Sequence, residues 1–244
     1  MTKRTVLAVF LGLSLGGASA AHAQSGPSVP PEFYVNVSVG AQTPGHTVNS
    51  ASTFTLYDEE GKLDSTYRSR SAVIVDIAGG HRIWRSMSVG AAYTEFSKSS
   101  TGETIATVPN PLFFDQPVVT GTIGLGELEH KEHGLHVNAA WWIPISDKID
   151  IAISVGPSFI FVTQEVATLP VVEDGTQNVT GFLKEKQSGT AFGVNVGFDG
   201  TYLFTPRFGA GLLVRYAGGS VDLPNLKGLT VGGFQIGLGI RMRF

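Results

Sequence analysis

The sequence contains no cysteine among its 244 residues, and charged residues make up only 15% of the chain. Without cysteine there is no disulfide, no thiolate chemistry and no Cys-ligated metal. A soluble domain usually carries about 25% charged residues, so the composition points away from an ordinary water-facing surface. The net charge is −3 and no basic stripe is present, so we expect no nucleic-acid partner.

Long apolar runs are lacking as well. The one near the N-terminus, residues 6–15, follows Lys3 and Arg4 and precedes Ala21-His22-Ala23. It is shorter than the roughly 20 residues that a membrane helix needs, and its flanks are those of a secretory signal peptide. We therefore expect a signal peptide over residues 1–23, with cleavage after Ala23. Residues 24–32, with three prolines, are expected to form a flexible periplasmic lead-in.

The most informative pattern that is present is a strict alternation at the C-terminus. The even positions there are all apolar: Phe234, Ile236, Leu238, Ile240, Met242 and Phe244. The odd positions are polar or small: Gln235, Gly237, Gly239, Arg241 and Arg243. A period of two residues indicates a strand, and a tilted strand of this length spans the hydrocarbon layer of an outer membrane.

Seven further segments alternate in the same way: residues 33–41, 72–83, 87–96, 135–143, 149–161, 191–204 and 208–216. The connections between the eight segments are alternately short and long, with long ones at about residues 42–71, 97–133, 164–189 and 217–229. Tyr93, Phe161, Phe192 and Tyr216 stand near the long connections, where an aromatic girdle is expected. Bacterial outer-membrane barrels have an even strand number, short periplasmic turns and long outer loops.

The sequence thus predicts an all-β fold, an eight-stranded antiparallel up-and-down transmembrane β-barrel over residues 33–244, in the outer membrane. A soluble barrel of eight strands buries apolar residues inside and presents polar ones outside. The apolar faces of these segments lack the Lys and Glu of a water-facing surface.

The last strand carries a resemblance to a known family. Residues 232–244, alternating and ending in an aromatic residue, resemble the C-terminal assembly signal of outer-membrane proteins. The chain is similar to the small outer-membrane β-barrel superfamily of the OmpA transmembrane domain, OmpX and OmpW. The resemblance implies that the barrel-assembly machinery recognises Phe244, with Phe234, Ile236, Leu238, Ile240 and Met242 as the rest of the signal. Outer-membrane lipid and lipopolysaccharide are the expected surroundings, and the chain is expected to be a monomer.

Seven charged side chains are expected inside the barrel by strand parity: Asp76, Arg82, Asp150, Asp199, Arg215, Arg241 and Arg243. The interior of an eight-stranded barrel is only wide enough for its own side chains. Charges there must pair, because an isolated buried charge is very costly. We interpret them as a polar plug that fills the lumen. The alternative is a narrow pathway for small solutes.

Two chemical hypotheses concern histidine. His130, His133 and His136 invite a metal site, but on a strand His133 faces away from the other two, so we expect no metal and no cofactor. A hydrolase would need a serine beside a base. His81 and Ser88 fall near one turn but on opposite faces, so we expect no enzyme, with a lipid-modifying enzyme as the third alternative.

One long connection is distinctive, because Leu112-Phe113-Phe114 lies between prolines. These side chains suit three roles: capping the barrel mouth, which we favour, insertion into the outer leaflet, or contact with a partner. The sequence as a whole indicates a non-enzymatic barrel with a structural or surface-interaction role.

Overall fold

The computed structural model describes residues 30–43, 47–68, 71–173 and 177–244. The predicted signal peptide and most of the predicted lead-in lie outside these residues. The described residues contain no helix long and apolar enough to span a bilayer. Eleven strands make up the fold: β1 (Phe33–Gln42), β2 (Val48–Leu56), β3 (Glu59–Arg68), β4 (Ala72–Trp84), β5 (Met87–Val108), β6 (Val118–Val119), β7 (Ile123–Pro144), β8 (Ile149–Val172), β9 (Val179–Leu203), β10 (Phe208–Leu223) and β11 (Leu226–Arg243).

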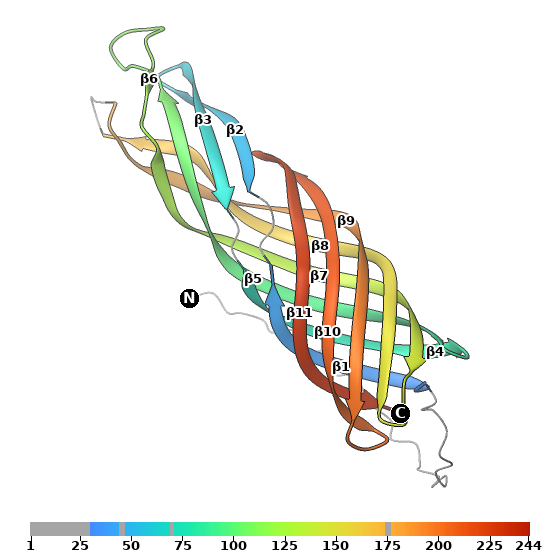
Figure 1. The fold of residues 1–244 in the computed structure, drawn as a ribbon. Coiled ribbons are helices and arrows are strands. Elements are labelled where there is room, and N and C mark those ends of the chain that lie inside the picture. Colours follow the sequence, from blue (N-terminus) through green and yellow to red (C-terminus); the bar gives the residue numbers. More distant parts are fainter. Residues whose placement is uncertain (1–29, 44–46, 69–70, 174–176) are drawn as a thin grey trace, which may run out of the picture.

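Eight of these strands close into an antiparallel barrel (Figure 1). Going round it, the order is β1, β4, β5, β7, β8, β9, β10 and β11, and β11 pairs with β1 to close the ring. Val37 on β1 lies opposite Ile240 on one side and Ile77 on the other. The closure extends to the end of the chain, since Phe33 and Phe244 exchange two backbone hydrogen bonds. The predicted eight-stranded up-and-down barrel is confirmed.

Three short turns join strands at one rim of the barrel. The hydroxyl of Ser146 accepts a hydrogen bond from the amide of Ile149, and Thr205 does the same for Phe208. Ser and Thr favour turns because their hydroxyls can bond to backbone groups a few residues on. Arg85 in the third turn has a positive φ of 39°. In outer-membrane barrels the rim with short turns faces the periplasm.

At the other rim the expectation of long loops is wrong, because most of that chain is regular sheet. β5 and β7 each have 22 residues, β8 has 24 and β9 has 25. The β2–β3 hairpin adds to the same sheet, since β3 pairs with the far end of β5. We call this region the extension: β2, β3, β6 and the parts of β5 and β7–β11 that lie beyond Tyr93, Phe161, Phe192 and Tyr216. The rest of the barrel is the transmembrane part. All four of these aromatic side chains are exposed, as an aromatic girdle requires.

Strand β8 shows why the alternation in the sequence did not predict the strands of the extension. In the transmembrane part Ile153 and Val155 point outward and are about half exposed. In the extension the apolar residues point inward instead, with Val162 and Val166 almost fully buried and Glu165 outside. Even-numbered residues of β8 point inward up to Val166, but the inner face changes from polar to apolar where the surroundings of the barrel change from lipid to water. The extension therefore has an interior apolar core, which we call the extension core: Tyr67, Leu125, Leu128, Ile160, Val162, Val166, Ala167, Ala191, Leu223, Leu226, Leu229 and Val231.

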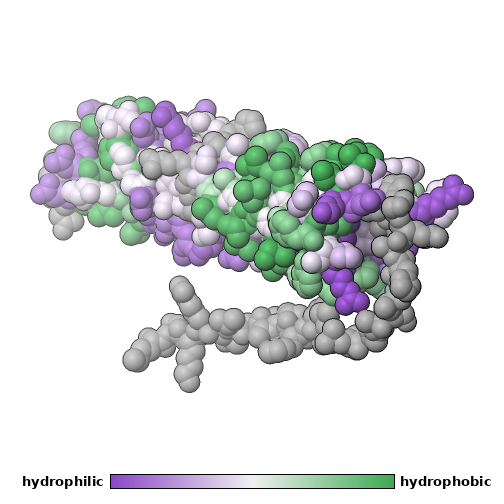
Figure 2. Space-filling view, turned by 60° about the horizontal axis from the view of Figure 1, so that its bottom comes forward, coloured by the Kyte–Doolittle hydropathy of each residue, from purple (hydrophilic) through white to green (hydrophobic). Residues whose placement is uncertain are grey.

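The exterior of the transmembrane part is an apolar band. On β11 the side chains of Ile236, Leu238 and Ile240 are 47%, 69% and 59% exposed. Figure 2 shows hydrophobic residues gathered around one part of the elongated molecule, with hydrophilic residues covering much of the remainder. Such a belt is stable against hydrocarbon and would be unfavourable in water.

Candidate functional site

The lumen of the transmembrane part holds three buried ion pairs, each joining strands that are far apart in the sequence. They involve six of the seven charged residues that parity predicts inside. Each pair combines one aspartate with one arginine, so the charges of the three pairs balance. Arg82 belongs to none of them: it is half-buried near the β4–β5 turn.

The first pair is a three-membered cluster. The guanidinium of Arg215 on β10 donates to Asp76 on β4 at 2.8 Å and to the hydroxyl of Thr94 on β5 at 2.9 Å. Thr94 in turn donates to the same aspartate oxygen at 2.7 Å. All three side chains are at most 3% exposed. The cluster ties one wall of the barrel to the opposite wall, as a packed lumen requires.

The second pair is bidentate. Arg241 on β11 donates from Nε and Nη2 to the two carboxylate oxygens of Asp199 on β9, at 2.8 and 2.6 Å. Its Nη1 also donates to the hydroxyl of Ser38 on β1. Gly211 on β10 makes room for this side chain, because a Cβ there would lie 2.5 Å from Nε of Arg241. Glycine in the lumen thus admits a large neighbour here.

The third pair lies nearest the periplasmic rim. Arg243 contacts Asp150 on β8, and its guanidinium also lies over the ring of Trp142, 5.4 Å from the centroid. The indole of Trp142 donates to Ser88 and meets Tyr34 edge to face. Aromatic rings and charges fill this level together.

A fourth polar cluster lies at the top of the lumen, just below the extension core. The carboxylate of Glu132 accepts hydrogen bonds from the amide side chain of Gln42 at 3.2 Å and from the backbone of Gly232 at 2.9 Å. Its other oxygen lies 2.8 Å from His130, whose Nδ1 contacts Gln164. A buried carboxylate with this many partners is well satisfied. Residue parity puts Glu132 on the same face of β7 as His130, but the register that brings Gln42 and Gly232 to it depends on other strands.

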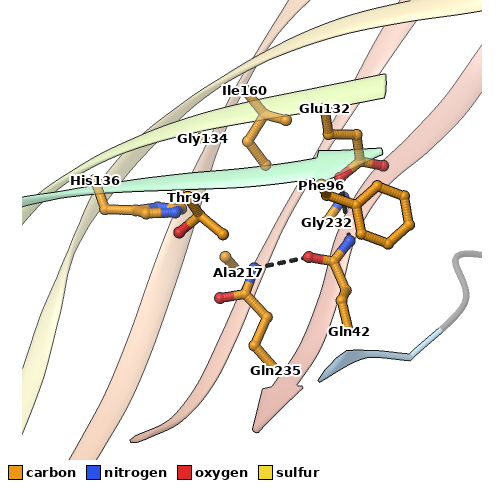
Figure 3. A pocket seen from close by; sticks show the side chains of 10 residues that line it. All are labelled: Gln42, Thr94, Phe96, Glu132, Gly134, His136, Ile160, Ala217, Gly232 and Gln235. Atoms are coloured by element: carbon orange, nitrogen blue, oxygen red, sulfur yellow. Dashed lines mark hydrogen bonds between the residues drawn. The ribbon is translucent and has the colours of Figure 1, made fainter. Parts of the chain in front are cut away.

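A small cavity separates this upper cluster from the Asp76 cluster. It measures about 10 Å³, room for roughly one water molecule. Figure 3 shows His136 and Thr94 on one side of it, with Gln42, Gln235 and Glu132 on the other. In the sequence Gln235 belongs to the polar or small positions of the C-terminal strand, but nothing there indicated that it would line the same cavity as His136.

The three histidines do not converge. His130 and His136 point into the lumen and are 3% and 1% exposed, while His133 points outward and stacks on Tyr93. No group of His, Asp and Glu suited to a metal ion occurs among the described residues.

His136 does have a serine partner that the sequence did not reveal. Ser158, directly opposite on β8, has its hydroxyl 2.7 Å from Nδ1 of His136. A period-2 reading of one strand cannot find such a pair, because it depends on the register between two strands. Ser158 is fully buried in the lumen. The hydroxyl is also held by the side-chain amide of Asn195.

The residues of the expected assembly signal lie along β11 and at its end. Phe234, at 44% exposure, and Phe244, at 50%, mark the two edges of the apolar band on this strand. Ile236, Leu238 and Ile240 lie between them on the outer face, and Met242 is half-buried.

At least three solved structures have a similar fold. The chain is similar to the outer membrane protein OprG from Pseudomonas aeruginosa, with a TM-score of 0.50 and 10% identity over 89% of this chain and 98% of that one. The fold is that of an outer-membrane barrel. Neisserial surface protein A (NspA) gives 0.47 at 14% identity, covering 87% and 97% of the two chains. Ail, the attachment invasion locus protein of Yersinia pestis, gives 0.39 at 10% identity, covering 86% and 99%. No family model and no curated protein matches the sequence.

The chain therefore has the fold of an outer-membrane β-barrel, and its apolar band and aromatic girdle are those of a barrel that spans a membrane. In outer-membrane barrels short turns face the periplasm, and by this rule we expect the extension to lie outside the cell. Its outer face carries charged residues.

One such group is a charge cluster on the outer face of the extension. Glu129 on β7 contacts both Lys131 on the same strand and Lys186 on β9. Hydrogen bonds from Lys131 and Lys186 lower the pKa of Glu129 to about 2, and Glu129 raises the pKa of Lys186. Lys131 lies opposite Thr163 and Lys186 opposite Glu165, a few residues beyond Phe161 of the girdle.

The distal end of the extension carries the Leu112-Phe113-Phe114 segment. These side chains are 77%, 58% and 74% exposed, so the expectation that they cap the barrel mouth is wrong. The loop is braced, since the side chain of Asn110 accepts from the amide of Leu112 and Glu59 accepts from that of Asp115. The apolar residues of the extension core fill the mouth instead.

Proposed function

We propose that this chain is a non-enzymatic outer-membrane protein with a plugged lumen, and that its function resides in the outer surface of the extension. One observation carries the proposal. The three lumen ion pairs fill the transmembrane part, and the extension core closes the barrel above them. A closed interior leaves the exterior for interaction with other molecules.

The second candidate is a narrow channel for small solutes, favoured by the many polar groups in the lumen. Against it stands the small size of the cavity between the polar clusters, which accommodates about one water. Conductance in planar bilayers distinguishes the two. We expect no discrete openings from the wild type beside a porin control. Openings that disappear in Gly197→Ala, whose new Cβ would lie 2.6 Å from the hydroxyl of Ser154, would establish the channel.

A lipid-modifying enzyme is the third candidate, and the Ser158–His136 hydrogen bond is the observation that favours it. The pair lacks two features of a hydrolase. Among the residues that the structure describes, no carboxylate bonds to the second ring nitrogen of His136, and Ser158 faces the closed lumen rather than lipid. We expect the mass spectrum of lipid A to be identical in cells with wild-type protein, Ser158→Ala and no protein. A mass shift lost in Ser158→Ala would overturn the non-enzymatic assignment.

The exposed apolar segment at the distal end is our candidate contact site. Leu112, Phe113 and Phe114 stand on a braced loop farthest from the membrane, and single exposed apolar patches of this kind often mark interaction sites. A photo-crosslinking phenylalanine analogue at Phe114 tests this in living cells. We expect a defined adduct there, identified by mass spectrometry, and none when the analogue replaces Leu183, which is 54% exposed elsewhere on the extension. Equal adducts at both positions would refute the assignment.

For lipid, we propose that outer-membrane lipid surrounds the apolar band and that lipopolysaccharide headgroups meet Lys131 and Lys186. Both cations lie just above the girdle, where headgroup phosphates are found, and exposed lysine binds phosphate as a point charge.

We also propose a monomer, since the barrel closes on itself without a free strand edge in the transmembrane part.

For assembly, we propose that Phe244 is the residue recognised by the barrel-assembly machinery. The side chain lies at the periplasmic end of β11 and is half exposed. Phe244→Ala is expected to lower the amount of folded barrel in the outer membrane several-fold, seen as loss of the heat-modifiable band on gels. Phe204→Ala, at an exposed aromatic position 67% accessible in a periplasmic turn, is the control and should assemble normally.

A further inference from the structure

We propose that the cavity between His136 and Gln235 is a binding site for one water molecule, which joins the His136–Ser158 pair to the Glu132 cluster. The inference rests on the placement of hydrogens around the cavity, on two buried atoms left without partners, and on the size of the space.

The hydrogens on His136 follow from its neighbours. The side-chain amide nitrogen of Asn195 lies 3.0 Å from the carbonyl of Gly156, which fixes it as the donor end of that amide. The same nitrogen donates to the hydroxyl of Ser158 at 3.0 Å. Among the described residues Nδ1 of His136, 2.7 Å away, is the acceptor available to the hydroxyl hydrogen of Ser158, so we assign that hydrogen to this bond. With Nδ1 as the acceptor, the neutral imidazole carries its hydrogen on Nε2, which is a donor.

A second chain of hydrogen bonds orients Gln235. The carboxylate of Glu132 requires a donor from Gln42, so the nitrogen of Gln42 points to it and its oxygen points away. That oxygen accepts from the amide nitrogen of Gln235 at 2.7 Å. The oxygen of Gln235 is then an acceptor. Figure 3 shows these side chains around the cavity.

Both of these atoms lack a partner among the described residues. Nε2 of His136 and Oε1 of Gln235 are buried and form no hydrogen bond, and their side chains are 1% and 3% exposed. Both residues line the same cavity, together with the hydroxyl-bearing Thr94. An unpaired buried donor and an unpaired buried acceptor beside one space of about one water are the conditions for an ordered water.

Water is the ligand class that fits this chemistry. A metal ion or other cation would be repelled by an N–H group, and an apolar group would leave both atoms unpaired. Water both donates and accepts, so it can take the hydrogen from His136 and give one to Gln235. The water would also connect two groups of hydrogen-bonded side chains, making one network from Asn195 through His136 and Gln235 to His130.

Nuclear magnetic resonance on the whole exported chain, labelled with ¹⁵N-histidine in lipid nanodiscs, tests the site. We expect His136 to be the Nε2–H tautomer, with a cross-peak between that hydrogen and water. A hydrogen on Nδ1, or no contact between the Nε2 hydrogen and water, would overturn the proposal.

Gly134→Ala is the decisive variant, because its new Cβ would lie 2.7 Å from Nε2 of His136, on the cavity side. We expect the water cross-peak to be lost in a folded barrel. Gly124→Ala in the same strand adds a methyl group with no atom within 4 Å, and it should leave the cross-peak intact. Gln235→Met serves if Gly134→Ala does not fold. It removes the acceptor at similar volume and should weaken the cross-peak, whereas an unchanged cross-peak in either folded variant would refute the site.

Discussion

Each arginine of the three lumen pairs is held by an aspartate from a different strand, so every pair acts as a tie between walls of the barrel. Arg241 illustrates the energetics, because its guanidinium is 1% exposed and has Asp199 as its only carboxylate partner among the described side chains. Two opposite charges in such a site offset each other, whereas one left alone does not.

A double-mutant cycle measures this balance. Asp199→Ala leaves the guanidinium of Arg241 buried without its counter-charge and should reduce the free energy of unfolding by about 3–5 kcal/mol. Asp199→Ala combined with Arg241→Ala should lose less than the sum of the two single changes. Urea unfolding in lipid vesicles gives the values, and strict additivity would show that the pair is not coupled.

On the outer face of the extension Glu129 has a different environment, because 28% of its side chain is accessible to solvent. Its pKa in the folded chain, about 2, lies below the ordinary value of 4.5 because Lys131 and Lys186 donate hydrogen bonds to it. A lowered pKa in the folded state means that the interaction stabilises the fold above the ordinary pKa and is lost as the pH falls towards 2.

The carboxyl carbon shift of Glu129, followed by nuclear magnetic resonance against pH, should therefore titrate well below the other exposed glutamates. Lys131→Gln together with Lys186→Gln should return the midpoint towards 4.5. Lys62→Gln, on β3, is the control that should not move it. A titration midpoint of Glu129 that is the same in the double variant as in the wild type would show that the two lysines do not bind Glu129 in solution.

At the scale of elements, the extension is a sheet with its own apolar core and the transmembrane part has a polar one. Leu226 is fully buried in the extension core. Leu226→Ala should cost about 2–5 kcal/mol, as truncation of a buried leucine does. Because Leu226→Ala creates a new cavity within the extension core, we expect faster amide exchange in the extension strands and little change in β1 and β4.

Hydrogen exchange with mass spectrometry separates these regions. Leu183→Ala, at a position on the extension that is 54% exposed, is the matched control and should leave exchange unchanged. Acceleration across the whole barrel after Leu226→Ala would mean that the two cores unfold as one unit.

The elements also show what the sequence could and could not predict. Alternation located the eight membrane strands because lipid outside and a polar lumen inside give every residue a clear side. Beyond the girdle the outside becomes polar, and the inside changes from Glu132 and His130 to Leu128 within a few residues. A bulge at Gly102 on β5, near Gly126 of positive φ on β7, shifts the register as well. Beyond the girdle, therefore, the alternation of apolar and polar residues no longer indicates which side of a strand faces inward. From the sequence alone, the strand segments of the extension resemble loops.

The same reasoning applies to the site. Parity predicted which charges point inward, since that depends only on position along one strand. It did not predict that Arg215 meets Asp76 or that Ser158 meets His136, because those contacts depend on the stagger between strands. Stagger is fixed by the closure of the whole barrel.

For the whole molecule, the orientation in the membrane is the property most directly open to test. The absence of cysteine makes single-cysteine variants clean reporters. Leu112→Cys should react with a membrane-impermeant maleimide on intact cells, because it lies at the distal end of the extension. Lys148→Cys, in a short turn, should react only after the outer membrane is permeabilised. Labelling in the reverse pattern would invert the topology.

The reversal of polarity along β8 also fixes how deep the molecule sits. Movement outward by a few ångströms would bring Phe161 into water, and movement inward would draw Glu165 into hydrocarbon. Both movements are unfavourable, so we expect the barrel to keep its depth in bilayers of slightly different thickness. Where the hydrocarbon layer of the bilayer is thicker or thinner than the apolar band, we expect the lipids next to the barrel to compress or stretch. The barrel then sets the thickness of the membrane in its immediate surroundings.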